Sequence, residues 1–342
     1  MPTLKIQPIQ YRDEWHSKLA KLIYSIFYQG IFKPILDILD DPERSDNART
    51  TALESALKRG DIQFKEGAFI GKVNAAISKE IKGYGGKFVR GSWRLASPSL
   101  PPHIQNAIHY NVRMMEMFQL KVNNLFDKMP KTVTAMIENM NVKKMGLEGL
   151  NRVSIEFKHR LNKAVSVYPD LGTKGKKGFN LEYNETTTKP IKEKLLSEYE
   201  DGIIPPCRDF AQEIVEDLRR DLHNYVMGGR PRGEIKDFIA KRLGVSETRA
   251  TFIARQETAL MTVAFTKQQY ANAGVNKYEW VTAGDHVVRG NRPDDSGNHK
   301  VLHGKIFAWD APPGAEHFST KEPCHPGEDY RCRCVAKPIV EW

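Results

Sequence analysis

The stretch CHPGEDYRCRCVAKP (residues 324–338) decides how the rest of the chain is interpreted. Three of the four cysteines fall within the eleven residues 324–334, and His299 and His303 precede them. Thiols and imidazoles at short range are ligands that suit zinc. The spacing differs from the paired CxxC of a strong zinc signature, so a metal site, a disulfide and packed free thiols all remain open.

The CRC triplet favours a shared side for its two sulfurs. Residues two apart in an extended strand face the same way, so Cys332 and Cys334 would present both thiols to one face. The spacing of Cys332 and Cys334 in a strand is too short for an easy disulfide, whereas a disulfide from Cys324 to either of them is possible. No Ser/His/Asp order or pair of carboxylates surrounds the cluster, so we expect a structural rather than a catalytic site. The ligands predicted for a structural zinc ion are Cys332, Cys334, His303 and Cys324, with His299 and His325 as alternates.

The segment that leads into the cluster has the pattern of β-structure. Short runs rich in β-branched and aromatic residues predict strands at 278–281, 286–288, 305–309 and 332–340. Asp285 and Arg289 are four apart and are expected to form a local ion pair or a turn. The C-terminal third is therefore expected to be α+β.

Upstream of residue 275 the chain is predicted to be mainly α-helical. Apolar residues recur at steps of three and four, and Ser246 is expected to cap the start of a separate helix. The helical segments are 19–32, 50–64, 106–126, 131–140, 150–167, 205–226, 234–245 and 247–274. The predicted fold class is thus α+β, with a mainly α-helical N-terminal two thirds followed by a small α+β C-terminal module.

Three consecutive regions are expected along the chain. Prolines at 97–103 separate a helical N-terminal region (1–96) from a helical middle region (104–228). The middle region contains a Gly/Lys-rich basic loop at 169–190, and the α+β module follows at 230–342.

The charge balance favours acidic partners. The chain of 342 residues has 52 Lys and Arg against 42 Asp and Glu, a net charge of +10, which suits nucleic acid. No run of about 18 apolar residues occurs, so no membrane span is expected. Residues predicted to contact DNA or an acidic partner are Lys174, Lys176, Lys177, Arg331 and Arg333.

Five ordered elements at the C-terminal end resemble a known family. They are IARQET (253–258), AGVNKYEW (273–280), DHVVR (285–289), HKVLHGKIF (299–307) and PGEDYRCRCVAKP (326–338). This order is similar to that of the Mu F-like family of phage minor head proteins, also called phage head morphogenesis proteins. The sequence departs from a common family version, because no Cys-Pro-x-Cys follows Asp285. The residues that carry the family motif are Arg255, Glu257, Trp280, Asp285, Arg289 and Gly304.

The resemblance implies a minor head protein of a tailed bacteriophage or related particle. Such a protein would be made in the host cytoplasm and lie inside the capsid at the portal vertex. It would act in head morphogenesis, and in genome packaging or ejection. Its partners would be the portal protein, other head proteins and phage DNA, which it would contact through phosphates. We expect no enzymatic activity. The alternative is a metal-dependent nuclease or toxin-like enzyme delivered with the genome.

Overall fold

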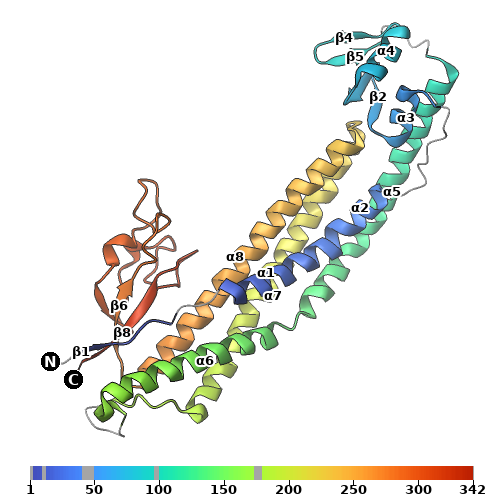
Figure 1. The fold of residues 1–342 in the computed structure, drawn as a ribbon. Coiled ribbons are helices and arrows are strands. Elements are labelled where there is room, and N and C mark those ends of the chain that lie inside the picture. The colour runs from blue at the N-terminus through green and yellow to red at the C-terminus, as the bar shows by residue number, and fades with distance from the viewer. Residues whose placement is uncertain (1–2, 10–12, 41–49, 96–99, 173–178, 342) are drawn as a thin grey trace. The chain divides into compact units, whose positions relative to one another are not determined.

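A computed structural model describes residues 3–9, 13–40, 50–95, 100–172 and 179–341. Of these described residues 63% are helical, and they include two four-stranded antiparallel sheets (Figure 1), which confirms the α+β class. The helices are α1 Asp13–Phe27, α2 Lys33–Leu39, α3 Ala52–Arg59, α4 Ala75–Gly83, α5 Pro102–Glu138, α6 Val142–Val167, α7 Glu185–Met227 and α8 Arg232–Asn272. The strands are β1 Thr3–Lys5, β2 Ile62–Lys65, β3 Ala68–Gly71, β4 Lys87–Val89, β5 Ser92–Arg94, β6 Lys277–Val281, β7 Ile306–Ala308 and β8 Val335–Glu341.

The chain divides into two compact units, each made of separate stretches. Unit 1 comprises residues 1–22, 140–207 and 249–342, and unit 2 comprises residues 23–139 and 208–248. The sequence predicts three regions that are each continuous along the chain. The compact units interleave instead, because α1, α7 and α8 each contribute residues to both.

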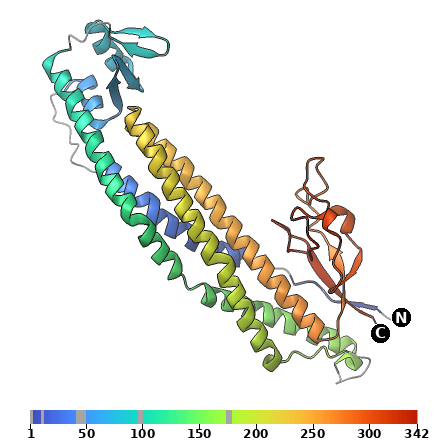
Figure 2. The ribbon, with the colours of Figure 1, turned by 180° about the vertical axis from the view of Figure 1, so that it is seen from behind.

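The sheet of unit 1 brings the two ends of the chain together. Its strand order is β1-β8-β6-β7, and Leu4 of β1 lies opposite Val340 of β8. Figure 1 and Figure 2 show both ends beside these strands. The central strand β6 buries Tyr278 and Trp280, as alternate residues of a strand must when one face is covered.

Close approaches of helix backbone to side chains fix the packing of the helices in unit 1. A Cβ at Gly149 of α6 would lie 2.0 Å from the indole of Trp15, so only glycine fits there. A Cβ at Gly202 of α7 would lie 2.1 Å from the carboxylate of Glu257, which places this side chain of α8 directly against the α7 backbone.

The sheet of unit 2 has the order β2-β3-β5-β4 and was not expected from the sequence. Its apolar side chains share a core with α3, α4 and the start of α5, and Figure 1 shows these elements next to the sheet. The prediction of one helix over residues 50–64 was wrong beyond Arg59. Gly60 adopts a left-handed conformation (φ +78°) that ends α3, and β2 begins two residues later.

Two helix boundaries and two strands also differ from the sequence prediction. Helix α7 begins at Glu185, well before the predicted start at residue 205. Helix α8 continues through Ser246, whose hydroxyl bonds to the carbonyl of Arg242 instead of capping a new helix. Residues 286–288 form turns and not a strand. The CRC triplet precedes β8, because Arg331 takes a positive φ of 55° that interrupts an extended path.

One helical stretch, Glu14–Leu39, is long and apolar enough to cross a membrane by length and composition. It comprises most of α1, a π-helical turn at Tyr28–Phe32, and α2. Within its most apolar window 44% is buried in the protein, and helices that lie in protein cores pass the same test.

Candidate functional site

The carboxylate of Asp329 is the centre of a buried polar network in unit 1. This side chain is 0% exposed. It accepts hydrogen bonds from the backbone N–H of Ser319 (3.1 Å), the Ser319 hydroxyl (2.5 Å) and the backbone N–H of Tyr330 (2.9 Å). The Nε2 of His299 lies 3.0 Å from it, and Arg289 forms an ion pair with it. A buried charge is tolerated only with such a full set of partners.

These partners set the ionisation of Asp329. Burial alone would raise the pKa of the carboxyl group. The hydrogen bonds from His299 and Ser319, and the charge of Arg289, outweigh burial and hold the pKa well below its usual value. Arg289 also donates to the Ser319 hydroxyl (2.7 Å) and to the Tyr330 carbonyl (2.8 Å). One guanidinium therefore ties together three separate loop segments.

The imidazole of His299 connects this network to the two thiols of the CRC triplet. Because Nε2 faces Asp329, Nδ1 faces the sulfurs, 3.6 Å from that of Cys332 and 3.8 Å from that of Cys334. The ring of Trp280 packs edge-on against the imidazole. Burial alone would lower the pKa of His299, but the bond to Asp329 and the proximity of Cys332 raise it to about 9.

The two sulfurs have different surroundings. The backbone N–H groups of Gly327 and Cys334 each lie 3.4 Å from the Cys332 sulfur. Hydrogen bonding from Cys334 and His299 holds the pKa of the Cys332 thiol well below its usual value. The hydrogen bond with Cys332, followed by burial and by the negative charge favoured at Cys332, raises the pKa of the Cys334 thiol, and the indole N–H of Trp280 opposes this shift. All four cysteines of the chain are free thiols.

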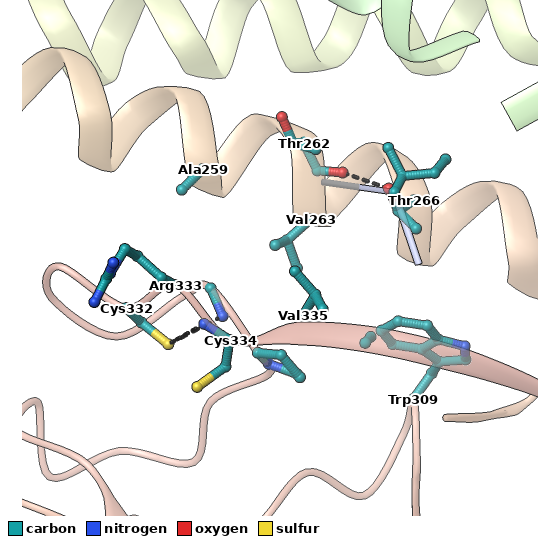
Figure 3. Close-up of a pocket in the computed structure, with 13 residues that line it drawn as sticks. Ala259, Thr262, Val263, Thr266, Trp309, Cys332, Arg333, Cys334 and Val335 are labelled. Carbon is teal, nitrogen blue, oxygen red and sulfur yellow. Dashed lines mark hydrogen bonds between the residues drawn. The ribbon is translucent and has the colours of Figure 1, made fainter. Parts of the chain in front are cut away.

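Helix α8 holds the loop that carries these groups. The side-chain amide of Gln256 donates to the Glu328 carbonyl (3.1 Å) and accepts from the backbone N–H of Arg331 (3.1 Å). Gly327 approaches α8 so closely that a Cβ there would lie 2.8 Å from Val263. Figure 3 shows Val263 pointing from α8 toward Val335, with the thiols beside them. The cavity left between these elements is about 40 Å³.

A second set of polar groups surrounds His325. Its Nδ1 lies 3.0 Å from the hydroxyl of Tyr278, and its Nε2 lies 2.9 Å from the ammonium of Lys267. Burial, followed by the charge of Lys267, lowers the pKa of His325 to about 4. Its backbone N–H donates to the Glu328 carboxylate (2.6 Å) within the same loop, and its ring connects that loop to Tyr278 of β6.

The structure separates the six residues proposed from the sequence as zinc ligands. Among the described residues, the group close enough to share one ion is His299, Cys332 and Cys334. The Nδ1 of the exposed His303 instead accepts from the backbone N–H of Thr282 (3.2 Å). The thiol of Cys324 donates to the Glu322 carbonyl (3.3 Å). His325 is engaged as described above.

The family-motif residues occupy different places in unit 1. Asp285 forms an ion pair with Arg333 at 2.6 Å, so the expected local pair with Arg289 is wrong, although residues 285–288 do form a turn. Gly304 has a φ of +78°, which a turn into β7 requires. Arg255 is half-buried on α8. Burial against α7 raises the pKa of Glu257 to about 7.

The predicted DNA-contact residues fall into two groups. Lys174, Lys176 and Lys177 lie outside the described residues. Arg333 is paired with Asp285, and the guanidinium of Arg331 stacks over the ring of Phe252 (5.6 Å). Arg289, Arg292, Arg331 and Arg333 line a pocket of about 170 Å³ that also borders His299 and the two thiols.

Sequence reasoning missed Asp329, Gln256 and Ser319. The first lies inside the quoted cluster, three residues before Cys332, and a carboxylate so close to Arg and Cys could have been proposed as a buried partner. Gln256 occupies the variable position of the IARQET element, and the sequence contains no signal for its loop contact. Ser319 lies in a segment with no recognised pattern.

Comparison with known proteins supports the resemblance over this same part of the chain. Residues 216–337 match the family described as Phage Mu protein F like protein. An uncharacterized protein of Haemophilus influenzae is 34% identical over 124 residues, which is 35% of this chain and 25% of the relative. The chain therefore matches only about a quarter of that relative's length. No solved structure matches the chain. The matched stretch includes α8, Asp329 and both thiols of the CRC triplet, so this part of the chain is similar to the Mu F-like family of phage proteins.

Proposed function

We propose that this chain is a minor head protein of a tailed bacteriophage or a related particle, acting in head morphogenesis. The match of residues 216–337 to the Mu F-like family carries the proposal, since this family suggests a phage head morphogenesis protein. The matched stretch includes the network around Asp329, which holds long irregular loops in one arrangement. A surface fixed in this way suits a protein that must fit other head proteins.

The proposed location is the capsid interior at the portal vertex, with the portal protein as a partner. A protein in this position lies beside packaged DNA, and a net charge of +10 suits that surrounding. The chain would assist packaging or ejection by holding DNA through phosphates, with little preference for sequence.

The sheet of unit 2 offers a specific surface for such contacts. Between Lys58 and Arg94 there are nine basic and three acidic residues. Six of the cations are exposed, and none forms an ion pair within the part of the chain that the structure describes. They are Lys72, Lys79, Lys82, Lys87, Arg90 and Arg94. Phe88 is 61% exposed among them and packs on Trp93, which Lys82 also contacts.

Cations and an exposed aromatic ring on this small sheet and the adjoining helix α4 form a surface that phosphates and bases can contact. The register of β4 and β5 gives a physical reason for phosphate to bind at this sheet. Lys87 of β4 lies directly opposite Arg94 of β5, and like charges at such a position repel. A phosphate bound between them would relieve this repulsion. We therefore propose this sheet, rather than Arg331 and Arg333, as the main DNA contact among the described residues.

The test is quantitative mass spectrometry of purified particles, before and after triggered DNA ejection. The proposal predicts a few to a few dozen copies per full particle. Loss of these copies on ejection would show a delivery role, and retention would show a portal-bound assembly role. Absence from particles would overturn the proposal. A plasmid-nicking assay with divalent metal would then test the alternative of a nuclease.

A further inference from the structure

We propose that His299, Cys332 and Cys334 form a zinc site with three protein ligands, in which Nδ1 of the histidine and both sulfurs bind the ion. The inference goes beyond the proposed head role and rests on the geometry of unit 1. Thiolate and imidazole are the ligands that zinc takes in proteins, and three protein ligands leave one position open.

The distances between the ligand atoms fit a tetrahedral ion. Zinc bonds of about 2.3 Å to sulfur and about 2.0–2.1 Å to nitrogen place nitrogen and sulfur about 3.6 Å apart at a tetrahedral angle. The observed separations from His299 Nδ1 are 3.6 Å to Cys332 and 3.8 Å to Cys334. The three ligand atoms all lie within 4.8 Å of one another. The two measured nitrogen-to-sulfur separations are therefore close to those that one shared ion would give.

The groups behind the ligands are those that orient a metal site. Metal-binding histidines commonly donate their second N–H to a carboxylate, which fixes the ring and the tautomer. Asp329 takes this position, 3.0 Å from Nε2. The Cys332 sulfur is near two backbone N–H groups, those of Gly327 and Cys334. Such donors stabilise a thiolate.

An unpartnered buried group provides an independent sign. The indole N–H of Trp280 has no hydrogen-bond partner among the described residues, although the side chain is fully buried. A buried donor without an acceptor costs about 1–3 kcal/mol. This N–H lies close enough to the Cys334 sulfur to lower the pKa of that thiol, although the two do not meet hydrogen-bond geometry. A metal-bound thiolate at Cys334 would accept from it and remove the cost.

The fourth position of the ion faces the pocket of about 170 Å³, which all three ligands line. No further His, Cys, Asp or Glu among the described residues joins the group. Four arginines and one carboxylate, that of Asp295, line the same pocket, and this excess of cations favours an anionic ligand over a cationic one.

The first measurement is the metal content of the full chain, purified under reducing conditions from zinc-supplemented medium. We expect about one zinc per chain by elemental mass spectrometry. Protein that is folded by circular dichroism and holds no zinc above the buffer blank, even after reconstitution, would overturn the proposal. Rapid alkylation of Cys332 in that protein would identify a reactive thiol in place of a metal site.

Matched variants separate this ligand set from the one predicted by spacing alone. Cys332→Ser, Cys334→Ser and His299→Ala should lose zinc. Cys324→Ser and His303→Ala remove the same kinds of side chain nearby and should keep it. Zinc loss in His303→Ala with retention in His299→Ala would overturn the assignment. Because a ligand variant can fail to fold, replacement of zinc by Co²⁺ in the wild-type chain is an independent test. It should produce thiolate-to-cobalt charge-transfer absorption.

The cobalt form also tests the open position. Added inorganic phosphate should alter its visible bands, because the fourth ligand is exchangeable. Bands that stay unchanged at saturating phosphate would show a closed site and overturn that part of the proposal.

Discussion

The two four-stranded sheets are held in place by different interactions. In unit 2, short strands joined by tight turns cover apolar side chains of α3, α4 and α5, and the six exposed cations named above have no carboxylate partner among the described residues. In unit 1, long segments without regular structure connect β6 to β8, and buried charges hold them. The first sheet therefore depends mainly on apolar burial, and the second on a few polar groups that each have several partners.

This difference predicts that single polar substitutions have large effects in unit 1 and small ones in unit 2. Asp329→Asn is the most severe. It leaves Arg289 and His299 buried without their counter-charge, and the loss of one partner of a buried pair costs about 3–5 kcal/mol. Urea unfolding should show this loss, and hydrogen exchange should show it in residues 282–334.

The control for this substitution is Asp310→Asn, at an exposed residue of the same unit, which should change stability by less than about 0.5 kcal/mol. Exchange in the strands β2 to β5 should be unaffected by either variant. A loss for Asp329→Asn no larger than for the control would show that the network does not hold the sheet.

Gln256→Ala tests the clamp between α8 and the loop, with a smaller expected effect. The variant leaves the backbone groups of Glu328 and Arg331 without their partner, and a cost of about 1–3 kcal/mol follows. Gln268→Ala, at an exposed position of the same helix, is the matched control. Equal stability of the two variants would contradict the clamp.

The two sheets also differ in how far the sequence predicted them. The C-terminal sheet was largely expected, because KYEWV and VAKPIV carry clear strand patterns and stand between motifs. The sheet of unit 2 was missed because its strands have three or four residues each, too few to establish a period. The glycines of this region predict breaks in regular structure but not which elements they separate; Gly60, for example, ends α3.

The site shows the same limit at the level of single residues. The thiols and the histidines were found because they are rare residues close together in sequence. Which histidine contacts the thiols depends on the fold. His299 and His303 are four residues apart in the sequence, and the conformation of the loop directs the His299 side chain to the buried thiols. Asp329 and Gln256 are common residues whose role depends on burial, and no spacing reveals burial of a single polar side chain.

Glu257 gives a prediction with a defined pH window. Burial raises its pKa from about 4.5 to about 7, so the folded state binds a proton more tightly than the unfolded state. Stability is therefore lost as pH rises from about 4.5 to about 7, by roughly 1–2 kcal/mol once partial exposure is considered. Glu257→Gln has no such loss.

The Gln variant should exceed the wild type in stability at pH 8 and match it near pH 4.5. Urea unfolding at both pH values measures the difference. Glu193→Gln, at an exposed position of α7, should show no such dependence. A Gln variant that is less stable than the wild type at pH 8 would mean that the carboxylate has a charged partner at the α7 contact.

The cations of unit 2 should show the opposite relation between stability and binding. Lys87→Gln with Arg94→Gln removes the cross-strand repulsion, so stability should stay equal or rise by about 0.2–1 kcal/mol. DNA affinity should nevertheless fall, and the slope of log affinity against log salt should decrease by about 2, since two phosphate contacts are lost.

Lys128→Gln with Lys131→Gln makes the same change in charge on exposed positions of α5 and serves as the control. If both double variants reduce DNA binding equally, the net charge of the chain accounts for binding and the sheet has no special part. If only Lys87→Gln with Arg94→Gln reduces DNA binding, the repulsion between these two cations, which destabilises the free sheet, favours the binding of a phosphate between them.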